Sequence, residues 1–215
     1  QSVFFLYGPT REAVRLYLRD NAEEVKQALY NAETIDFGNR VGSYDHPFSK
    51  LLKKKFNIEM AFPKFMEMDI DKDSFAAANW TEGDGNSNIL IGVLDSANAP
   101  ASKETMLEMR KLHGKRFLPM DSTGALYLGT SKMFPQAHQP VVLNGYKGAK
   151  INGWWVIEGQ FRGGPYTRYT IYHEPTDQWI SIEGLVYYPN LENRKDGKSK
   201  TRYLRTLESI ISTLK

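Results

Sequence analysis

The residues best suited to chemistry lie between positions 153 and 188, where aromatic side chains crowd three successive segments. Rings that stay half open beside a cation can stack on a sugar ring or accept a partner protein. The glycines at 163 and 164 permit a close backbone approach, and consecutive N–H groups beside Arg162 can hold an anion. The candidate binding residues are Trp154, Trp155, Arg162, Gly163, Gly164, Tyr166, Arg168 and Tyr172.

A structural interpretation of the same residues stays open. Successive side chains of a strand point to opposite faces, so Ile180 and Ile182 share one face while Ser181 and Glu183 share the other. The face that mixes aromatic and polar groups is either open to a ligand or covered by a helix, and residues 162–165 are either an anion site or a tight turn. The binding interpretation requires exposed rings at Trp155 and Tyr166.

Catalytic and metal-binding patterns are missing from the sequence. There is no cysteine, no Gly-x-Ser-x-Gly elbow, no phosphate-binding loop and no dinucleotide motif. Asp69, Asp71 and Asp73 alternate as in a calcium loop, but Ser74 and Trp80 stand where that loop needs Gly and Glu. We therefore predict no catalytic residue, no metal and no cofactor.

A hydrolase remains the alternative. It requires one of the histidines to lie in a cleft within hydrogen-bond reach of a hydroxyl or a carboxylate. None of them has a partner at metal-binding spacing. They are His46, His113, His138 and His173.

The charge balance argues against nucleic acid as a partner. The chain has 28 Lys and Arg against 25 Asp and Glu, a net charge of +3 over 215 residues, which gives no chain-wide field. The basic stretch at 50–55 fits a helix C-terminus, and that at 194–205 fits a polar loop and a helix start. No apolar run reaches the roughly 20 residues that span a bilayer.

Periodicity predicts the elements of the first half. A short apolar run suggests a strand over residues 1–7, and Thr10 and Asp45 are expected to cap helices. The glycine-rich turn at 83–86 predicts a hairpin. The remaining expected elements are a strand over 58–62, hairpin strands over 75–82 and 88–95, and a helix capped by Ser102 with Met106, Met109, Leu112 and His113 on one stripe.

The second half reads as an antiparallel meander closed by a helix. Strands are expected over residues 126–129, 141–146, 151–161, 166–173 and 178–188, and the last helix carries Tyr203, Leu207 and Ile210 on one stripe. The predicted fold class is α+β, a largely antiparallel sheet with helices packed on its faces in a sandwich-like arrangement. We expect one domain over 1–215, with two similar strand-strand-helix halves at about 1–120 and 121–215 as an open possibility.

Several short motifs resemble a known family. They are Trp155-Val156, Phe161 with Gly163 to Tyr166, Gly184 to Pro189, Arg202 with Leu207-Glu208, and an earlier block from Leu52 to Pro63. Together they are similar to an uncharacterised family of bacterial cell-envelope proteins, domain of unknown function 4837. The Trp154-Trp155 pair and Arg162 depart from the family pattern. The layout also resembles the sandwiches of Mog-like and photosystem-extrinsic proteins.

The resemblance implies a place and brings no activity. Members of the family look like predicted lipoproteins, so it implies a periplasmic or outer-membrane location, with membrane attachment only through a lipid anchor outside this chain. We expect a processed portion of a longer protein that binds an envelope partner or a glycan without catalysis. A purely structural subunit of an envelope assembly is a third possibility, and it predicts an apolar patch near the chain start.

Overall fold

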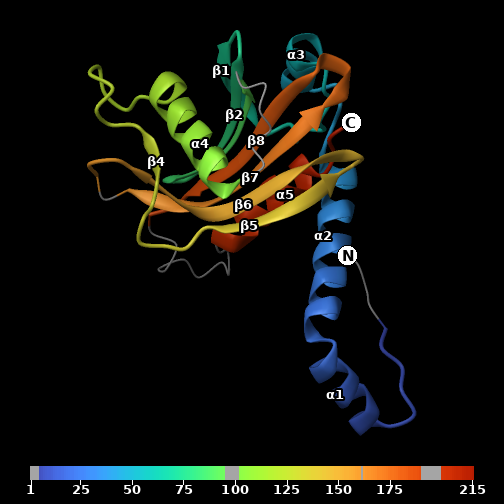
Figure 1. Ribbon diagram of the computed structural model, residues 1–215. Helices are drawn as coiled ribbons and strands as arrows, with labels where there is room; N and C mark the ends of the chain where they lie inside the picture. Colours follow the sequence, from blue (N-terminus) through green and yellow to red (C-terminus); the bar gives the residue numbers. More distant parts are fainter. Residues whose placement is uncertain (1–4, 95–101, 161, 190–199) are drawn as a thin grey trace.

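The computed structural model describes residues 5–94, 102–160, 162–189 and 200–215, with the side chains of residues 33–41 outside the description. Five α-helices and eight strands lie in these ranges (Figure 1). The helices are α1 (Arg11–Asp20), α2 (Ala22–Val41), α3 (Pro47–Phe56), α4 (Lys103–Phe117) and α5 (Lys200–Ile211). The strands are β1 (Glu67–Lys72), β2 (Phe75–Glu82), β3 (Gly85–Leu94), β4 (Leu128–Thr130), β5 (Ala137–Leu143), β6 (Tyr146–Ile157), β7 (Gly163–His173) and β8 (Gln178–Tyr187).

All the strands belong to one antiparallel sheet. Its order is β1-β2-β3-β8-β7-β6-β4, and β5 pairs with β6 beside β4. The hairpin predicted at 83–86 is the two-residue turn between β2 and β3. Pairing of β3 with β8, from Asn86↔Tyr187 to Leu94↔Trp179, joins the two halves of the chain at the centre of the sheet. The predicted α+β class with a largely antiparallel sheet is confirmed.

One face of the sheet packs on α5. Ile180, Ile182 and Val186 of β8 point into this layer and meet Leu207 and Ile210 of the helix, all of them buried. The terminal helix and its apolar stripe are therefore as predicted, and α3 closes the same layer at one end with Phe48, Leu52 and Phe56. This is the larger of the two cores.

The opposite face is covered by α4, so the two helices that follow β3 and β8 lie on opposite sides of the sheet (Figure 1). Ser102 caps α4 as expected, and its oxygen accepts a hydrogen bond from the N–H of Thr105 at 3.2 Å. The stripe that faces the sheet is rotated from the predicted one. Met106, Arg110 and Gly114 are buried, whereas Leu112 is 51% exposed.

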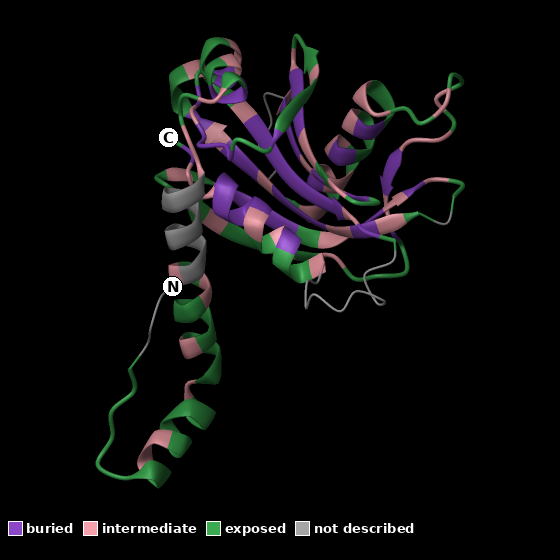
Figure 2. Ribbon diagram, turned by 180° about the vertical axis from the view of Figure 1, so that it is seen from behind, coloured by how far each residue is buried: buried purple, intermediate pink, exposed green. Residues whose placement is uncertain are grey.

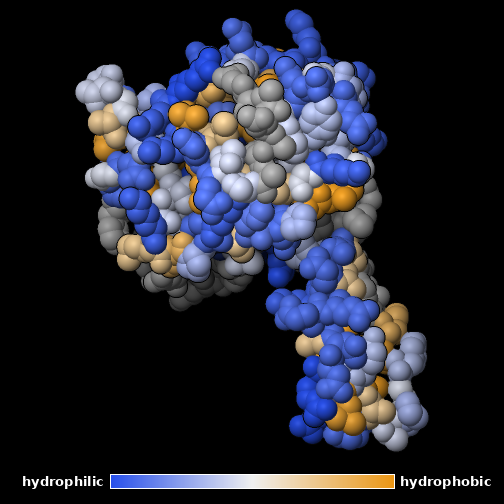
Figure 3. All heavy atoms as spheres, viewed as in Figure 1, coloured by the Kyte–Doolittle hydropathy of each residue, from blue (hydrophilic) through white to orange (hydrophobic). Residues whose placement is uncertain are grey.

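The helices α1 and α2 project from the sheet as an arm (Figures 1 and 2). No residue of α1 is buried, and Figure 3 shows apolar side chains along the arm between polar ones. Thr10 caps α1 as predicted. The strand expected over 1–7 is wrong for residues 5–7, which have no regular structure and are exposed, while residues 1–4 lie outside the description.

A buried carboxylate fixes the arm to the body. Glu208 of α5 accepts a hydrogen bond from Lys150 of β6 at 2.6 Å and a second one from the hydroxyl of Tyr30 on α2. Burial raises the pKa of Glu208 to about 7 and lowers that of Lys150 to about 8.

No described helix is long and apolar enough to cross a membrane.

Two local predictions need correction. His46, not Asp45, caps α3, because the His46 Nδ1 accepts from the N–H of Phe48 at 3.2 Å. Residues 58–62 alternate as expected and pack into the core, but their backbone pairs with the rest of the chain only at a bridge from Phe62 to Ser43 and at hydrogen bonds between Glu59 and Lys215. They therefore form no strand of the sheet. The carboxylates of Asp69 and Asp71, which alternate as in a calcium loop, lie on the exposed edge strand β1.

The packing of α5 gives the first testable expectation. Leu207 is fully buried, so Leu207→Ala removes buried methyl groups and leaves a cavity, which lowers the free energy of unfolding by about 2–5 kcal/mol. Urea denaturation followed by circular dichroism measures it. The matched control is Leu16→Ala on the arm, where the side chain is 40% exposed and the loss stays below about 1 kcal/mol. Equal losses would contradict the assignment of Leu207 to the core.

Candidate functional site

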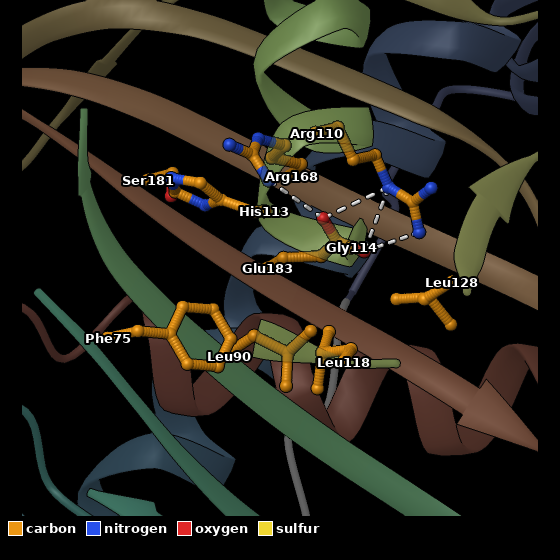
Figure 4. Close-up of a pocket in the computed structure, with 10 residues that line it drawn as sticks. All are labelled: Phe75, Leu90, Arg110, His113, Gly114, Leu118, Leu128, Arg168, Ser181 and Glu183. Atoms are coloured by element: carbon orange, nitrogen blue, oxygen red, sulfur yellow. Dashed lines mark hydrogen bonds and ion pairs between the residues drawn. The ribbon is translucent and has the colours of Figure 1, made fainter. Parts of the chain in front are cut away.

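A buried ionic cluster lies between α4 and the sheet (Figure 4). The carboxylate of Glu183 on β8 accepts hydrogen bonds from Arg110 of α4, Nε at 3.0 Å and Nη2 at 2.7 Å, and from Nη1 of Arg168 on β7 at 3.1 Å. The exposed fractions of these three residues are 2%, 2% and 3%. One anion thus holds two cations in a region that excludes solvent.

Each guanidinium nitrogen of Arg110 donates a hydrogen bond. Its Nη1 donates to the carbonyl of Gly129 at 2.7 Å and to the hydroxyl of Thr130 at 2.8 Å. Its guanidinium carbon lies 4.2 Å from the centre of the Tyr166 ring, a cation–π contact. Gly114, one turn further along α4, lies so close to the carbonyl of Leu128 that a Cβ there would stand 2.1 Å from that oxygen. These contacts set how α4 is rotated on the sheet.

The guanidinium of Arg168 makes fewer hydrogen bonds than that of Arg110. Beyond its single bond to Glu183, its Nε and Nη2 are buried and have no hydrogen-bond partner in the described structure. Burial lowers the pKa of Arg168, and the positive charge of Arg110 lowers it further, while Glu183 opposes both effects. Two cations against one carboxylate leave an excess positive charge in the core.

His113 of α4 completes the cluster. Its ring meets Phe75 edge-on at 5.9 Å and Phe117 at 5.7 Å between ring centres. Burial lowers the pKa of His113 to about 3, and the charge of Arg168 contributes to that shift. The imidazole is therefore neutral near pH 7, and its Nδ1 is another buried atom without a described partner.

The structure places three of the eight sequence-predicted site residues, Trp155, Tyr166 and Arg168, under α4. Trp155 is 4% exposed and Tyr166 is fully buried. The indole N–H of Trp155 donates to the carbonyl of Val186 at 3.0 Å, and the hydroxyl of Tyr166 donates to Gln136 at 2.9 Å. The exposed rings that the binding interpretation requires at Trp155 and Tyr166 are therefore not found, because α4 covers this face, as the structural interpretation allowed. Arg168 lies in the ionic cluster.

The remaining predicted residues lie elsewhere. Trp154 points to the opposite face from its neighbour Trp155, and Arg162 stands 5.6 Å from the centre of the Tyr187 ring. Tyr172 lies at the far end of β7, against Trp179 with ring centres 5.4 Å apart. The structure thus does not bring the predicted residues together as one surface.

The two glycines are explained by close packing. A Cβ at Gly163 would stand 2.7 Å from the Trp154 indole nitrogen, and one at Gly164 would stand 2.0 Å from the carbonyl oxygen of Val186. Neither position has room for a side chain. The anion-binding role considered for this link is not needed to account for its glycines.

The histidines offer little to a hydrolase. His173 has a hydroxyl partner, Thr176 Oγ1 at 2.7 Å, but it is 1% exposed. His46 caps α3 and its Nε2 bonds the carbonyl of Met66. His113 and His138 each have one buried ring nitrogen without a partner among the described residues. No group of three possible metal ligands occurs in the described part of the chain.

The model of the family called domain of unknown function (DUF4837) matches residues 46–213, which include every strand of the sheet together with α3, α4 and α5. This chain belongs to that family. The arm formed by α1 and α2 lies outside the match. The resemblance stated from short motifs is confirmed, and the family carries no established activity.

Two solved structures are similar in outline. Ran-binding protein Mog1p of Saccharomyces cerevisiae is 12% identical, with 74% of this chain and 89% of that chain covered and a TM-score of 0.46. LpqN, involved in cell envelope biogenesis of Mycobacterium tuberculosis, is 11% identical, with 72% and 79% covered and a TM-score of 0.37. Both TM-scores lie below 0.5, so both similarities are distant. No curated protein sequence matches.

Replacing the buried carboxylate of the ionic cluster by an uncharged amide should lower the stability of the protein strongly. Glu183→Gln leaves Arg110 and Arg168 buried without a carboxylate, so the free energy of unfolding falls by about 3–5 kcal/mol. Denaturant titration of both variants measures the effect. The control is Glu59→Gln, which breaks the solvent-exposed pair with Lys53 and costs no more than about 1 kcal/mol. A loss below 1 kcal/mol for Glu183→Gln would show that the cluster is not held by charge.

His113 predicts a dependence of stability on pH. The unfolded chain binds a proton at this residue near pH 6.5, whereas the folded chain stays neutral down to about pH 3. The unfolded state therefore binds more protons between these values, and stability falls as the pH drops below 6.5, by up to about 1.4 kcal/mol per unit. Urea denaturation at pH 7.5 and 5.5, in a buffer that contains no chloride or other halide ion, measures this loss of stability.

The variant His113→Gln isolates the contribution of this residue from those of His46, His173 and Glu208. Burial lowers the pKa of the two histidines and raises that of Glu208, and all three groups are unchanged in the variant. We expect the variant to lose about 1 kcal/mol less than the parent between the two pH values. Parallel curves for the two proteins would refute a neutral buried imidazole at position 113.

Proposed function

We propose that this chain is a non-catalytic binding module of the cell envelope that holds an acidic protein partner. The contact is made by Met133, Phe134, Trp154 and Lys200, which we call the Trp154 surface. The location rests on the family resemblance, and the surface rests on exposure and ring contacts. A folded domain made of one sheet with its helices on both faces serves as the rigid support, because β3 and β8 tie the two halves together.

The proposal rests on an exposed apolar loop that is held against the partly buried indole of Trp154. Met133 is 88% exposed and Phe134 is 48% exposed. The Phe134 and Trp154 rings lie 5.1 Å apart, and Lys200 Nζ stands 5.3 Å from the Trp154 ring. Large apolar side chains at this degree of exposure are typical of contact residues.

The loop is held in place before any partner arrives. The N–H of Ser131 donates to the carbonyl of Trp154 at 2.8 Å, and the amide of Gln136 donates to the carbonyls of Ser131 and Phe134 at 3.1 and 2.7 Å. A preorganised loop loses less conformational entropy on binding. This supports a contact surface over a mobile connection.

The chemistry of the surface favours a protein over a glycan. Aromatic residues and Met are enriched where proteins meet, and a central Trp is a common anchor. Lys132 is exposed next to Met133, and Lys200 sits over the indole. Cations around an apolar centre match a partner segment that carries carboxylates beside apolar side chains.

Photo-crosslinking tests this surface. A photoreactive residue at Met133 should label one defined protein in cells that express the chain, and Trp154→Ala should reduce that labelling at least about ten-fold, as expected for an anchor worth about 2 kcal/mol. The same probe at Val142, which is 69% exposed on β5, is the positional control. Trp179→Ala is the matched tryptophan control at the other end of the sheet. Labelling that survives Trp154→Ala, or that is equal from Val142, would contradict the proposal.

A second candidate is a structural subunit of an envelope assembly. It is favoured by the exposed apolar side chains near the chain start, Phe5 at 73% and Tyr7 at 87%, which form the patch that this possibility requires. The photoreactive probe placed at Tyr7 separates the two candidates. Labelling from Tyr7 that is insensitive to Trp154→Ala supports the structural role.

A further inference from the structure

A small cavity lies inside the ionic cluster (Figure 4). It has a volume of about 10 Å³ and is lined among others by Arg110, His113, Arg168, Ser181 and Glu183. That volume holds roughly one water-sized particle. A phosphate or a carboxylate is too large, so any occupant is a water molecule or a single-atom ion.

The charge around this cavity calls for an anion. Two guanidinium groups share the carboxylate of Glu183, which leaves one positive charge in excess. Arg110 uses Nε, Nη1 and Nη2 in hydrogen bonds and also contacts the Tyr166 ring. Arg168 uses one nitrogen and keeps two buried donors, Nε and Nη2, without a described partner. A buried charge that lacks partners is costly, and an anion beside Arg168 removes that cost.

His113 lines the same cavity and can take up a proton. The backbone of Val93 opposes the lowering of the His113 pKa, which is the effect of an acceptor near a ring N–H. Since Nδ1 is buried without a described partner, the neutral ring is assigned the tautomer with its hydrogen on Nε2. Nδ1 then carries a lone pair, and only its protonation makes it a donor to an anion.

We propose that this cavity binds one halide ion, chloride under ordinary conditions, held by Nε and Nη2 of Arg168 and taken up together with a proton on Nδ1 of His113. The halide ion offsets the excess positive charge of the two arginines and accepts hydrogen bonds from the unpaired donors of Arg168. The proton on His113 adds a charge of its own, and it makes Nδ1 a further donor to the ion. The other charges near the ring are Arg110 and Arg116 on α4 and Glu183 on β8, and Phe75 on β2 faces it as an apolar neighbour.

Bromide anomalous scattering tests the site directly. Crystals of the full chain grown in halide-free medium are soaked in sodium bromide at pH 5.5. We expect one internal anomalous peak within about 3.5 Å of Arg168 Nη2, the distance of a hydrogen bond to a large anion. Water density there without an anomalous signal would overturn the proposal.

Thermal denaturation in solution tests the linkage. At equal ionic strength, the midpoint should be higher in sodium bromide or chloride than in sodium gluconate, because a ligand that binds only the folded state stabilises it. The apparent halide affinity should rise with falling pH, by up to about ten-fold per unit for one coupled proton. The same affinity at pH 7.5 and 5.5 would refute the proton part.

Two variants and one control assign the residues. Arg168→Met should abolish the halide effect while Arg110 still pairs with Glu183. Arg162→Met, which replaces an exposed arginine directly before β7, should keep the halide effect. His113→Gln should keep halide stabilisation and lose its pH dependence. If Arg168→Met does not fold, the bromide peak in the parent protein decides. A halide effect that persists in folded Arg168→Met would place the ion elsewhere and refute the site.

Discussion

The alternation of side chains along β8 is the constraint on which the rest of the molecule depends. This central strand sends Ile180, Ile182 and Val186 to the α5 face, and Ser181 and Glu183 to the α4 face. A shift of one residue in its pairing with β3 or β7 would put a carboxylate into the apolar layer and isoleucines against Arg110. One register therefore specifies both an apolar core and an ionic one.

The apolar half of this arrangement could be predicted because local patterns carry it. The stripe of α5, the hairpin at 83–86 and the alternation of β8 are all visible within ten or so residues. The rotation of α4 could not be predicted in this way. Arg110 reads as a surface residue in a helical pattern, and only its partner Glu183, 73 residues away, makes its burial favourable. The edge strand β1 is missing from the expected strands for a related reason, since its alternating carboxylates carry no apolar face.

The candidate site shows the same division. Adjacent residues of a strand face opposite sides, so Trp154 and Trp155 could never share one surface, and this much was available from the sequence. Which of the two would stay accessible was not, because that depends on where α4 lies. The position of Phe134 beside Trp154 was also hidden, since the Ser131 N–H holds the loop against β6 and the Gln136 amide bonds within the loop, contacts that leave no periodic trace.

The two faces differ in what they require of their helix. An apolar layer such as that under α5 accepts small shifts, because dispersion and burial have little directionality. The α4 face has fixed geometry, since Arg110 must reach Glu183, Gly129 and Thr130 at once while Gly114 leaves room for the backbone at Leu128. Buried polar groups of this kind favour one arrangement over its competitors at some cost in stability. Here the cost is concentrated on Arg168, whose Nε and Nη2 have no described partner, so the part of the core that best specifies the fold also holds its least satisfied charge.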